Sequence, residues 1–203
     1  MERVLLLHGL WMRGFTLSRM AGRLRAAGFS VQALDYGTIW QGPQAAVEQA
    51  CSRIAAVGEP LHLVGHSLGG MVALECARRD PSRVGRVVCL GSPLSGSHAA
   101  NVLSHWPGGG AVLGRSGELL ARGVDAWAGA NPVGVIAGRL PLGFGFLFGG
   151  LGSPHDGTVA VSETRLPGLA DHIEVTTTHT GLLFSAEAAR QTIAFLRTGR
   201  FRR

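Results

Sequence analysis

Short apolar runs alternate with amphipathic helical segments along the chain, and this alternation is the feature that most restricts its fold. The runs with strand character lie at residues 4–7, 29–34, 61–64, 86–90, 133–137 and 172–176. The helical segments lie at residues 14–27, 43–56, 68–78 and 185–197. Strands that are apolar throughout are typical of a parallel sheet covered by helices on both faces. The pattern therefore predicts an α/β fold with a mostly parallel sheet.

The chain has 203 residues, which suffices for one α/β domain and leaves little room for a second core. We therefore predict a single domain over residues 1–203. A glycine-rich excursion at residues 95–131 interrupts the alternation after the fourth strand. Because it leaves from the carboxyl end of that strand, we expect it to cover the face of the molecule where such sheets bind ligands.

The segment Gly65-His66-Ser67-Leu68-Gly69 joins a predicted strand directly to a predicted helix. This strand, Gly-x-Ser-x-Gly, helix arrangement is that of the nucleophile elbow, a strained turn that holds a serine hydroxyl above a sheet. The glycines remove side chains that would collide with the neighbouring strand and helix. The start of the following helix favours a developing negative charge. Ser67 is therefore the predicted nucleophile.

A serine hydroxyl needs a base, because it is a poor nucleophile at neutral pH. Of the eight histidines, His179 is the one that follows the last predicted strand and precedes the last helix. That location places an imidazole at the same sheet edge as the elbow, whereas His172 begins the strand and lies at the opposite end. We predict that His179 is the general base.

The imidazole in turn needs a carboxylate that orients it and stabilises its cationic form. Asp156 stands in a glycine-flanked turn upstream of the strand that leads to the histidine. Asp80 and Asp171 are expected at the far edge of the sheet, and Asp125 in the excursion is the weaker alternative. Asp156 is the predicted acid.

Backbone amides must also bind the oxyanion that forms when the serine attacks a carbonyl. His8-Gly9 follows the first strand immediately, so the amide of Leu10 can meet the amide of Leu68, the residue after the nucleophile. These two amides are the predicted oxyanion hole.

Five segments in this order resemble the α/β-hydrolase superfamily, and small bacterial lipases and esterases in particular. They are HGLW, GHSLGG, GSPLSGS, DGTV and HTGLL, and together they span most of the chain. The resemblance implies ester hydrolysis through an acyl-enzyme, with Ser67, Asp156 and His179 as the catalytic triad. The first strand begins at about residue 4, so the two strands that usually precede it are missing. A minimal six-stranded sheet is expected.

The substrate is less constrained than the chemistry. Residues 140–151, LPLGFGFLFGGL, are uncharged and precede the predicted acid, so Phe144, Phe146 and Phe148 form either an acyl-binding wall or ordinary core. Trp11 is a further candidate substrate contact. We predict a small-molecule ester with an apolar acyl group. Thioester or carbon–carbon bond cleavage on the same triad and a non-catalytic binding protein remain alternatives, and transient contact with a lipid surface is open.

The composition excludes several other classes. All 19 basic residues are arginine, so Schiff-base chemistry and a phosphate-loop lysine are both excluded. The net charge is +6, but the arginines are scattered except in the last four residues, so no nucleic-acid partner is predicted. The three cysteines have the character of small buried hydrophobes. We expect no metal, no cofactor, no signal peptide, no membrane span and a cytoplasmic location.

Overall fold

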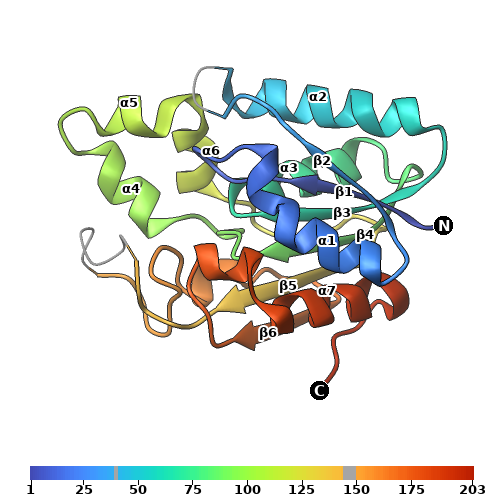
Figure 1. Ribbon diagram of the computed structural model, residues 1–203. Coiled ribbons are helices and arrows are strands. Elements are labelled where there is room, and N and C mark those ends of the chain that lie inside the picture. The colour runs from blue at the N-terminus through green and yellow to red at the C-terminus, as the bar shows by residue number, and fades with distance from the viewer. Residues whose placement is uncertain (39–40, 144–149) are drawn as a thin grey trace.

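The computed structural model describes residues 1–38, 41–143 and 150–203. Its strands form one parallel sheet in the order β2-β1-β3-β4-β5-β6 (Figure 1). The strands are β1 (Arg3–Leu7), β2 (Ser30–Leu34), β3 (Leu61–His66), β4 (Val84–Leu90), β5 (Val133–Gly138) and β6 (Asp171–Val175). The predicted α/β fold with six strands is confirmed, and every strand pair in the sheet is parallel.

Four longer helices cover the two faces of this sheet. They are α1 (Ser18–Ala26), α2 (Gly42–Val57), α3 (Leu68–Arg79) and α7 (Ala186–Thr198). The segment predicted as one helix at 14–27 begins instead as a 3-10 turn, η1 (Gly14–Leu17). The amide of Gly14 donates to the Asp35 carboxylate at 3.2 Å, which ties this first turn to the end of β2.

The two faces of the sheet carry separate hydrophobic cores because strand side chains alternate in direction. Leu5 and Leu7 pack with α2 and α3, whereas Val4 and Leu6 pack with α1 and α7. Figure 1 shows the same layers, with α1 and α7 on one side and α2 and α3 on the other. The inner strands β1, β3, β4 and β5 are therefore mostly buried from both faces, as the sequence pattern predicts, whereas the edge strands β2 and β6 are partly exposed.

The excursion is built from short helices. They are α4 (His98–Ser104), α5 (Gly109–Leu113), η2 (Gly114–Ser116) and α6 (Gly117–Arg122). Figure 1 shows α4 and α5 beyond the arrowheads of β5 and β6, at the end of the sheet where the predicted site lies. Asn131 closes the excursion, and its side-chain amide donates to the carbonyls of Pro81 at 3.0 Å and Val84 at 2.5 Å. Two further 3-10 turns, η4 (Ser162–Thr164) and η5 (Thr180–Leu183), lie near the end of the chain.

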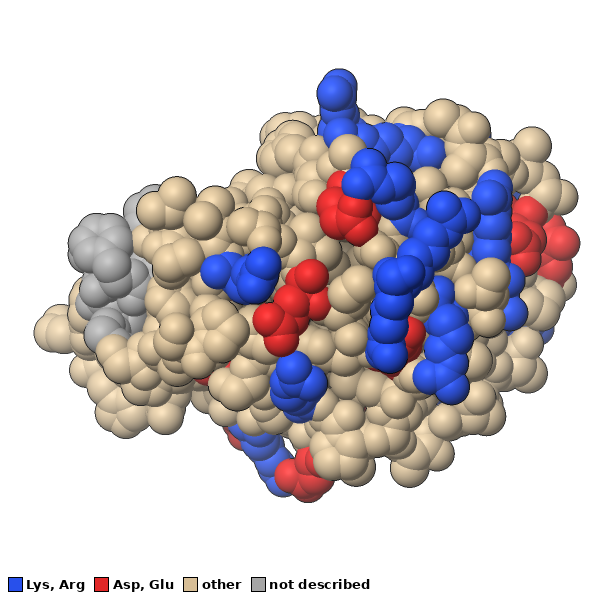
Figure 2. All heavy atoms as spheres, turned by 90° about the horizontal axis from the view of Figure 1, so that it is seen from below, with Lys and Arg blue, Asp and Glu red and all other residues tan. Residues whose placement is uncertain are grey.

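Arginine side chains are numerous on the face drawn in Figure 2, and acidic side chains lie among them. Several arginines bind backbone carbonyls between elements, as Arg86 does to Leu196 and Arg197 to Ala27, at 2.6 Å each. Others form ion pairs, including Arg203 with Asp171 at 2.9 Å. These three arginines help to join α7 and the C-terminal residues to the sheet and to the end of α1.

None of the helices in the described ranges combines the length and the apolar character that a bilayer crossing requires.

Candidate active site

Ser67 occupies a strained turn between β3 and α3. Its φ and ψ are 54° and −121°, a conformation that residues with a side chain rarely adopt. A Cβ on Gly65 would lie 2.2 Å from the carbonyl oxygen of Gly69, and a Cβ on Gly69 would lie 2.3 Å from that of Leu7. Both glycines are therefore required by close backbone approach. Strain of this kind costs on the order of 1–3 kcal/mol and is characteristic of functional sites.

His179, which follows β6, and Asp156, which lies between β5 and β6, form a short hydrogen bond. The Nδ1 atom of His179 lies 2.7 Å from Oδ2 of Asp156, whose side chain is 1% exposed. The other carboxylate oxygen accepts the amides of Thr158 at 3.0 Å and Val159 at 2.8 Å. The carboxylate is thus held on both oxygens. The proton of the neutral imidazole is drawn to Nδ1, and the lone pair is left on Nε2.

The ends of β3, β4 and β6 bring this pair to the elbow. His66, the residue before the nucleophile, has its Nε2 atom 3.0 Å from the backbone carbonyl of His179, and the two ring centroids are 4.7 Å apart. A Cβ on Gly91, just after β4, would lie 3.1 Å from both His179 Nδ1 and Asp156 Oδ2. The amide of Ser67 donates to the carbonyl of Leu90 at 2.9 Å, which fixes the turn on β4.

His66 is a functional candidate that the sequence reasoning missed. Its side chain is buried, and burial lowers the pKa of its imidazole to about 3. The neutral ring uses its Nε2 proton to hold the His179 carbonyl, so Nδ1 carries the lone pair, and within the described residues this atom has no hydrogen-bond partner. The sequence signal is its position beside Ser67, but the contact to His179 joins residues 113 positions apart.

The predicted oxyanion amides belong to the loop after β1 and to the first residue of α3. A Cβ on Gly9 would lie 3.1 Å from the Cβ of Ser67, so the loop after β1 touches the elbow. As the first residue of α3, Leu68 has an amide that no helical carbonyl can accept. The amide of Leu10 makes no backbone hydrogen bond to another residue of the described ranges. Within the described residues, neither amide therefore has a backbone acceptor in the structure.

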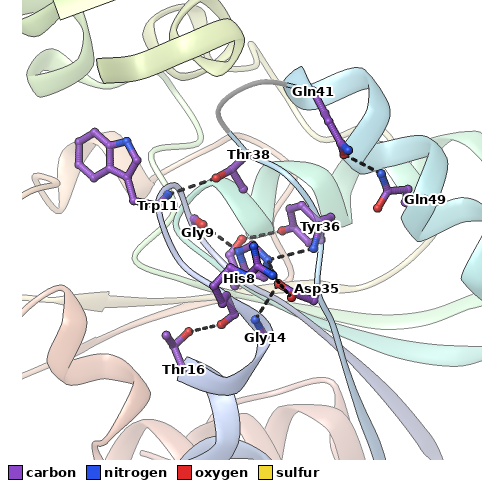
Figure 3. A network of polar contacts seen from close by, with 11 residues as sticks. His8, Gly9, Trp11, Gly14, Thr16, Asp35, Tyr36, Thr38, Gln41 and Gln49 are labelled. Carbon is purple, nitrogen blue, oxygen red and sulfur yellow. Dashed lines mark hydrogen bonds and ion pairs between the residues drawn. The ribbon is translucent and has the colours of Figure 1, made fainter. Parts of the chain in front are cut away.

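A buried network supports this loop from β2 and the segment that follows it (Figure 3). The Tyr36 hydroxyl donates to the His8 carbonyl at 2.6 Å, and the two rings stack with centroids 4.1 Å apart. His8 is buried, which lowers its pKa, and its Nε2 accepts the Tyr36 amide at 3.3 Å. A neutral His8 with its proton on Nδ1, facing the Gly9 carbonyl at 2.9 Å, satisfies the contacts with Gly9 and Tyr36, and its Nε2 also lies 3.4 Å from Oδ1 of Asp35.

Within the described residues, Trp11 joins Ser67 as a non-glycine residue whose backbone has a positive φ, which is 59° for Trp11. Its amide donates to the Thr38 hydroxyl at 3.2 Å (Figure 3). The Thr38 carbonyl accepts the Ser116 hydroxyl of the excursion at 2.8 Å. Thr38 and Ser116 are both buried. Thr38 therefore links the excursion to the loop that carries the Leu10 amide, and sequence spacing carried no signal for this link.

The alternative acids lie elsewhere. Asp171 begins β6, where it pairs with Arg203 and accepts the amide of Phe201 at 2.9 Å. Asp80 ends α3, and Asp125 is exposed in the segment after α6. Trp11 is 56% exposed beside the elbow loop, whereas Phe144, Phe146 and Phe148 lie outside the described residues. Among the described residues, no three His, Cys, Asp or Glu side chains are grouped as a metal ion requires.

A parallel sheet with a strained serine turn beside a carboxylate-bound histidine defines an α/β protein whose site lies at the carboxyl ends of its strands. The model of the alpha/beta hydrolase family matches residues 4–196, so the chain belongs to this family. The resemblance drawn from the sequence motifs is confirmed.

Curated relatives include a probable esterase, PIR7A, of Oryza sativa subsp. indica and its counterpart in subsp. japonica. The chain is 35% identical to each over 112 residues, which are 49% of this chain and 43% of the relative. The chain thus matches less than half the length of these relatives.

Solved structures share the fold. The Bacillus licheniformis lipase BlEst2 in its mature form has a TM-score of 0.76 at 17% identity, covering 98% of this chain and 92% of the lipase. In the propeptide form the TM-score is 0.81 at 18% identity, covering 100% of this chain and 51% of the other. A monoacylglycerol lipase of Paleococcus ferrophilus has a TM-score of 0.64 at 19% identity, covering 97% and 94%.

Proposed function

We propose that this chain is a serine hydrolase that cleaves carboxylic esters with apolar acyl groups through an acyl-enzyme. The observation that carries the proposal is the 2.7 Å contact between His179 and the buried Asp156, next to a serine held at a φ of 54°. A nucleophile, a base and an acid that orients the base are the parts that acyl transfer needs. They lie at the carboxyl ends of parallel strands, where α/β proteins bind their ligands.

In the proposed reaction, Nε2 of His179 takes the proton of the Ser67 hydroxyl while its oxygen attacks the ester carbonyl. The amides of Leu10 and Leu68 bind the oxyanion, and Asp156 stabilises the imidazolium. The imidazolium then protonates the leaving alcohol, and the acyl group stays on Ser67. Water, deprotonated by His179, attacks the acyl-enzyme and releases the acid, which restores the serine. No metal or cofactor enters the proposed steps.

The preference for apolar acyl groups is supported by the surface around this edge. Trp11 and Phe15 follow β1, Leu142 follows β5 and Phe184 follows β6, and all four side chains are exposed. Because the strands are parallel, segments that follow their carboxyl ends lie at the same edge as Ser67. The printed names of the relatives and of several similar structures, esterase and lipase, agree with an ester substrate.

The test combines covalent labelling with a substrate panel. A fluorophosphonate should label the wild-type protein and leave Ser67→Ala unlabelled. p-Nitrophenyl acetate, butyrate and octanoate should be hydrolysed, and Ser67→Ala should lose about 10⁵- to 10⁶-fold in kcat.

The panel also separates the alternatives. Acyl-CoA thioesters with the same acyl groups are run beside the esters, and a higher kcat/KM on them would replace the esterase assignment by a thioesterase. A protein that neither reacts with the phosphonate nor hydrolyses any member would be a binding protein on this fold.

A further inference from the structure

A groove of about 730 Å³ runs along the outer face of α3, outside the candidate active site. Helix α2 and the η2–α6 segment form its sides, and residues 124–130 close it. Helix α3 contributes Met71, Leu74, Glu75 and Arg78, whose spacing places them on one helical face. Ser67, Asp156, His179 and the two oxyanion residues are not among its lining residues. The groove is therefore separate from the proposed chemistry.

The floor of the groove is apolar. Val47, Met71 and Leu74 are buried, and Leu119 and Val124 of the excursion are half-buried against them. Trp127 is 8% exposed, and its indole N–H already donates to the carbonyl of Asn131 at 2.9 Å. The rest of that indole is carbon, so it offers apolar contact. A floor of this kind favours an alkyl chain.

The rim of the groove is positively charged. Arg78 and Arg79 both bind Glu75, at 2.7 and 2.8 Å, so that carboxylate is already satisfied. Arg115 and Arg122 are exposed, and neither forms an ion pair with a carboxylate in the described ranges. A Cβ on Gly42 would lie 2.9 Å from the Cβ of Arg115, so the base of this arginine packs on the first turn of α2.

The rim also carries Glu118, so the charged side chains that line the groove are four arginines and two glutamates. Arg115, Glu118 and Arg122 follow one another at helical spacing, so the two unpaired guanidinium groups stand one turn to either side of that glutamate. The net positive rim above an apolar floor is complementary to a molecule with an anionic head and an apolar chain.

We propose that this groove binds a single-chain amphiphile with an anionic head, namely a long-chain carboxylate. Its head binds the guanidinium groups of Arg115 and Arg122, which suit carboxylates through paired N–H donors. Its chain lies on the floor between α2, α3 and Trp127. The volume is within the roughly 300–1,000 Å³ of small-molecule sites, which fits one such molecule. This site does not depend on the chemistry at Ser67.

Isothermal titration of the whole protein with sodium dodecanoate, below its micelle concentration, tests the head group. The double variant Arg115→Glu/Arg122→Glu should weaken binding at least tenfold. The matched control Arg19→Glu/Arg25→Glu makes the same charge change on α1, across the sheet, and should leave Kd within about twofold. Arg115→Gln/Arg122→Gln should also weaken binding, and it covers the case in which the charge-reversed variant unfolds.

Chain length and charge test the rest of the proposal. Affinity should rise about three- to fourfold per added methylene from octanoate to dodecanoate, as burial of about 0.8 kcal/mol per methylene implies. Dodecyltrimethylammonium, with the same chain and a positive head, should bind at least tenfold more weakly. Equal affinity for the two heads, or equal affinity in the groove variants and the control, would overturn the proposal.

Covalent occupation of Ser67 distinguishes the groove from the active site. Protein saturated with the fluorophosphonate should bind dodecanoate as the unlabelled protein does, because the groove lies elsewhere. Loss of binding on labelling would place the carboxylate in the catalytic cleft and refute the groove. If the phosphonate does not react at all, the proposed function fails while the groove variants still decide the binding site.

Discussion

Replacement of Asp156 by asparagine changes one atom of a buried side chain. In the native protein Oδ1 accepts two backbone amides, from Thr158 and Val159, and Oδ2 faces Nδ1 of His179 at 2.7 Å. An asparagine can keep its carbonyl oxygen on the two amides. Its NH₂ group then occupies the position of Oδ2, so a donor faces the Nδ1–H donor of the imidazole. The fold is retained, but the histidine must adopt the other tautomer.

The expected loss in kcat follows from that tautomer. With its proton on Nε2, the imidazole cannot accept the proton of the Ser67 hydroxyl. Removal of the orienting carboxylate in serine hydrolases costs about 10⁴-fold in kcat, which corresponds to about 5.4 kcal/mol of transition-state stabilisation. We expect the same loss here, with KM changed by less than about threefold, because both oxygens of the buried Asp156 are already bound by Thr158, Val159 and His179.

The assay is hydrolysis of p-nitrophenyl butyrate at neutral pH, together with the rate of fluorophosphonate labelling. Thermal unfolding checks that the Asp156→Asn protein is folded. The matched controls are Asp125→Asn, an exposed carboxylate, and Asp171→Asn, which pairs with Arg203 at the other end of β6. Both should keep kcat within about fivefold. A kcat within tenfold of wild type for Asp156→Asn, or a larger loss for Asp125→Asn, would refute the assignment.

Two further predictions concern residues that support the site. Thr38→Val keeps the side-chain shape but removes the hydroxyl that accepts the Trp11 amide, so kcat should fall about tenfold at nearly constant KM. Thr16→Val in η1, whose hydroxyl donates to the Arg13 carbonyl, is its control, and equal losses would argue against a positioning role. His66→Gln tests the buried imidazole, whose pKa of about 3 lies below the value of 6.5 expected when unfolded. Because the unfolded chain then binds more protons, wild-type stability should fall by up to about 1.4 kcal/mol per unit as pH drops between these values. In urea unfolding at several pH values, the free energy of unfolding of His66→Gln should depend less steeply on pH than that of the wild type. Equal pH dependence of the two proteins would contradict a neutral His66.

Local sequence patterns predicted the fold because each one reflects a local physical requirement. Three of the four residues at 61–64 are apolar because β3 is buried from both faces, and the strand continues in the structure to His66. Gly65 and Gly69 surround Ser67 because a Cβ on either residue would lie within 2.3 Å of a backbone oxygen. The choice of Asp156 followed from chain order in a parallel sheet, and its contact with His179 agrees with that choice.

The contacts that hold the site could not be predicted in the same way. The His66 ring and the His179 carbonyl are 113 residues apart, and Ser116 and Thr38 are 78 apart. Neither pair has a periodicity or a motif, since each depends on how loops from different strands pack at one edge of the sheet. The segment predicted as a helix at 14–27 is helical over nearly the same residues, but its first turn is a 3-10 turn whose Gly14 amide is bound by the Asp35 carboxylate, a contact between distant segments.

The sequence by itself determined the class of fold, the strained serine turn and the order of the polar residues along the chain. These features depend on neighbours within a few positions, where periodicity and backbone sterics act directly. Only the tertiary structure decided which atoms meet: the neutral His66 beneath the histidine, the Thr38 link to the excursion and the arginine-rimmed groove on α3. Such contacts form between segments that only folding brings together, so no local pattern in the chain encodes them.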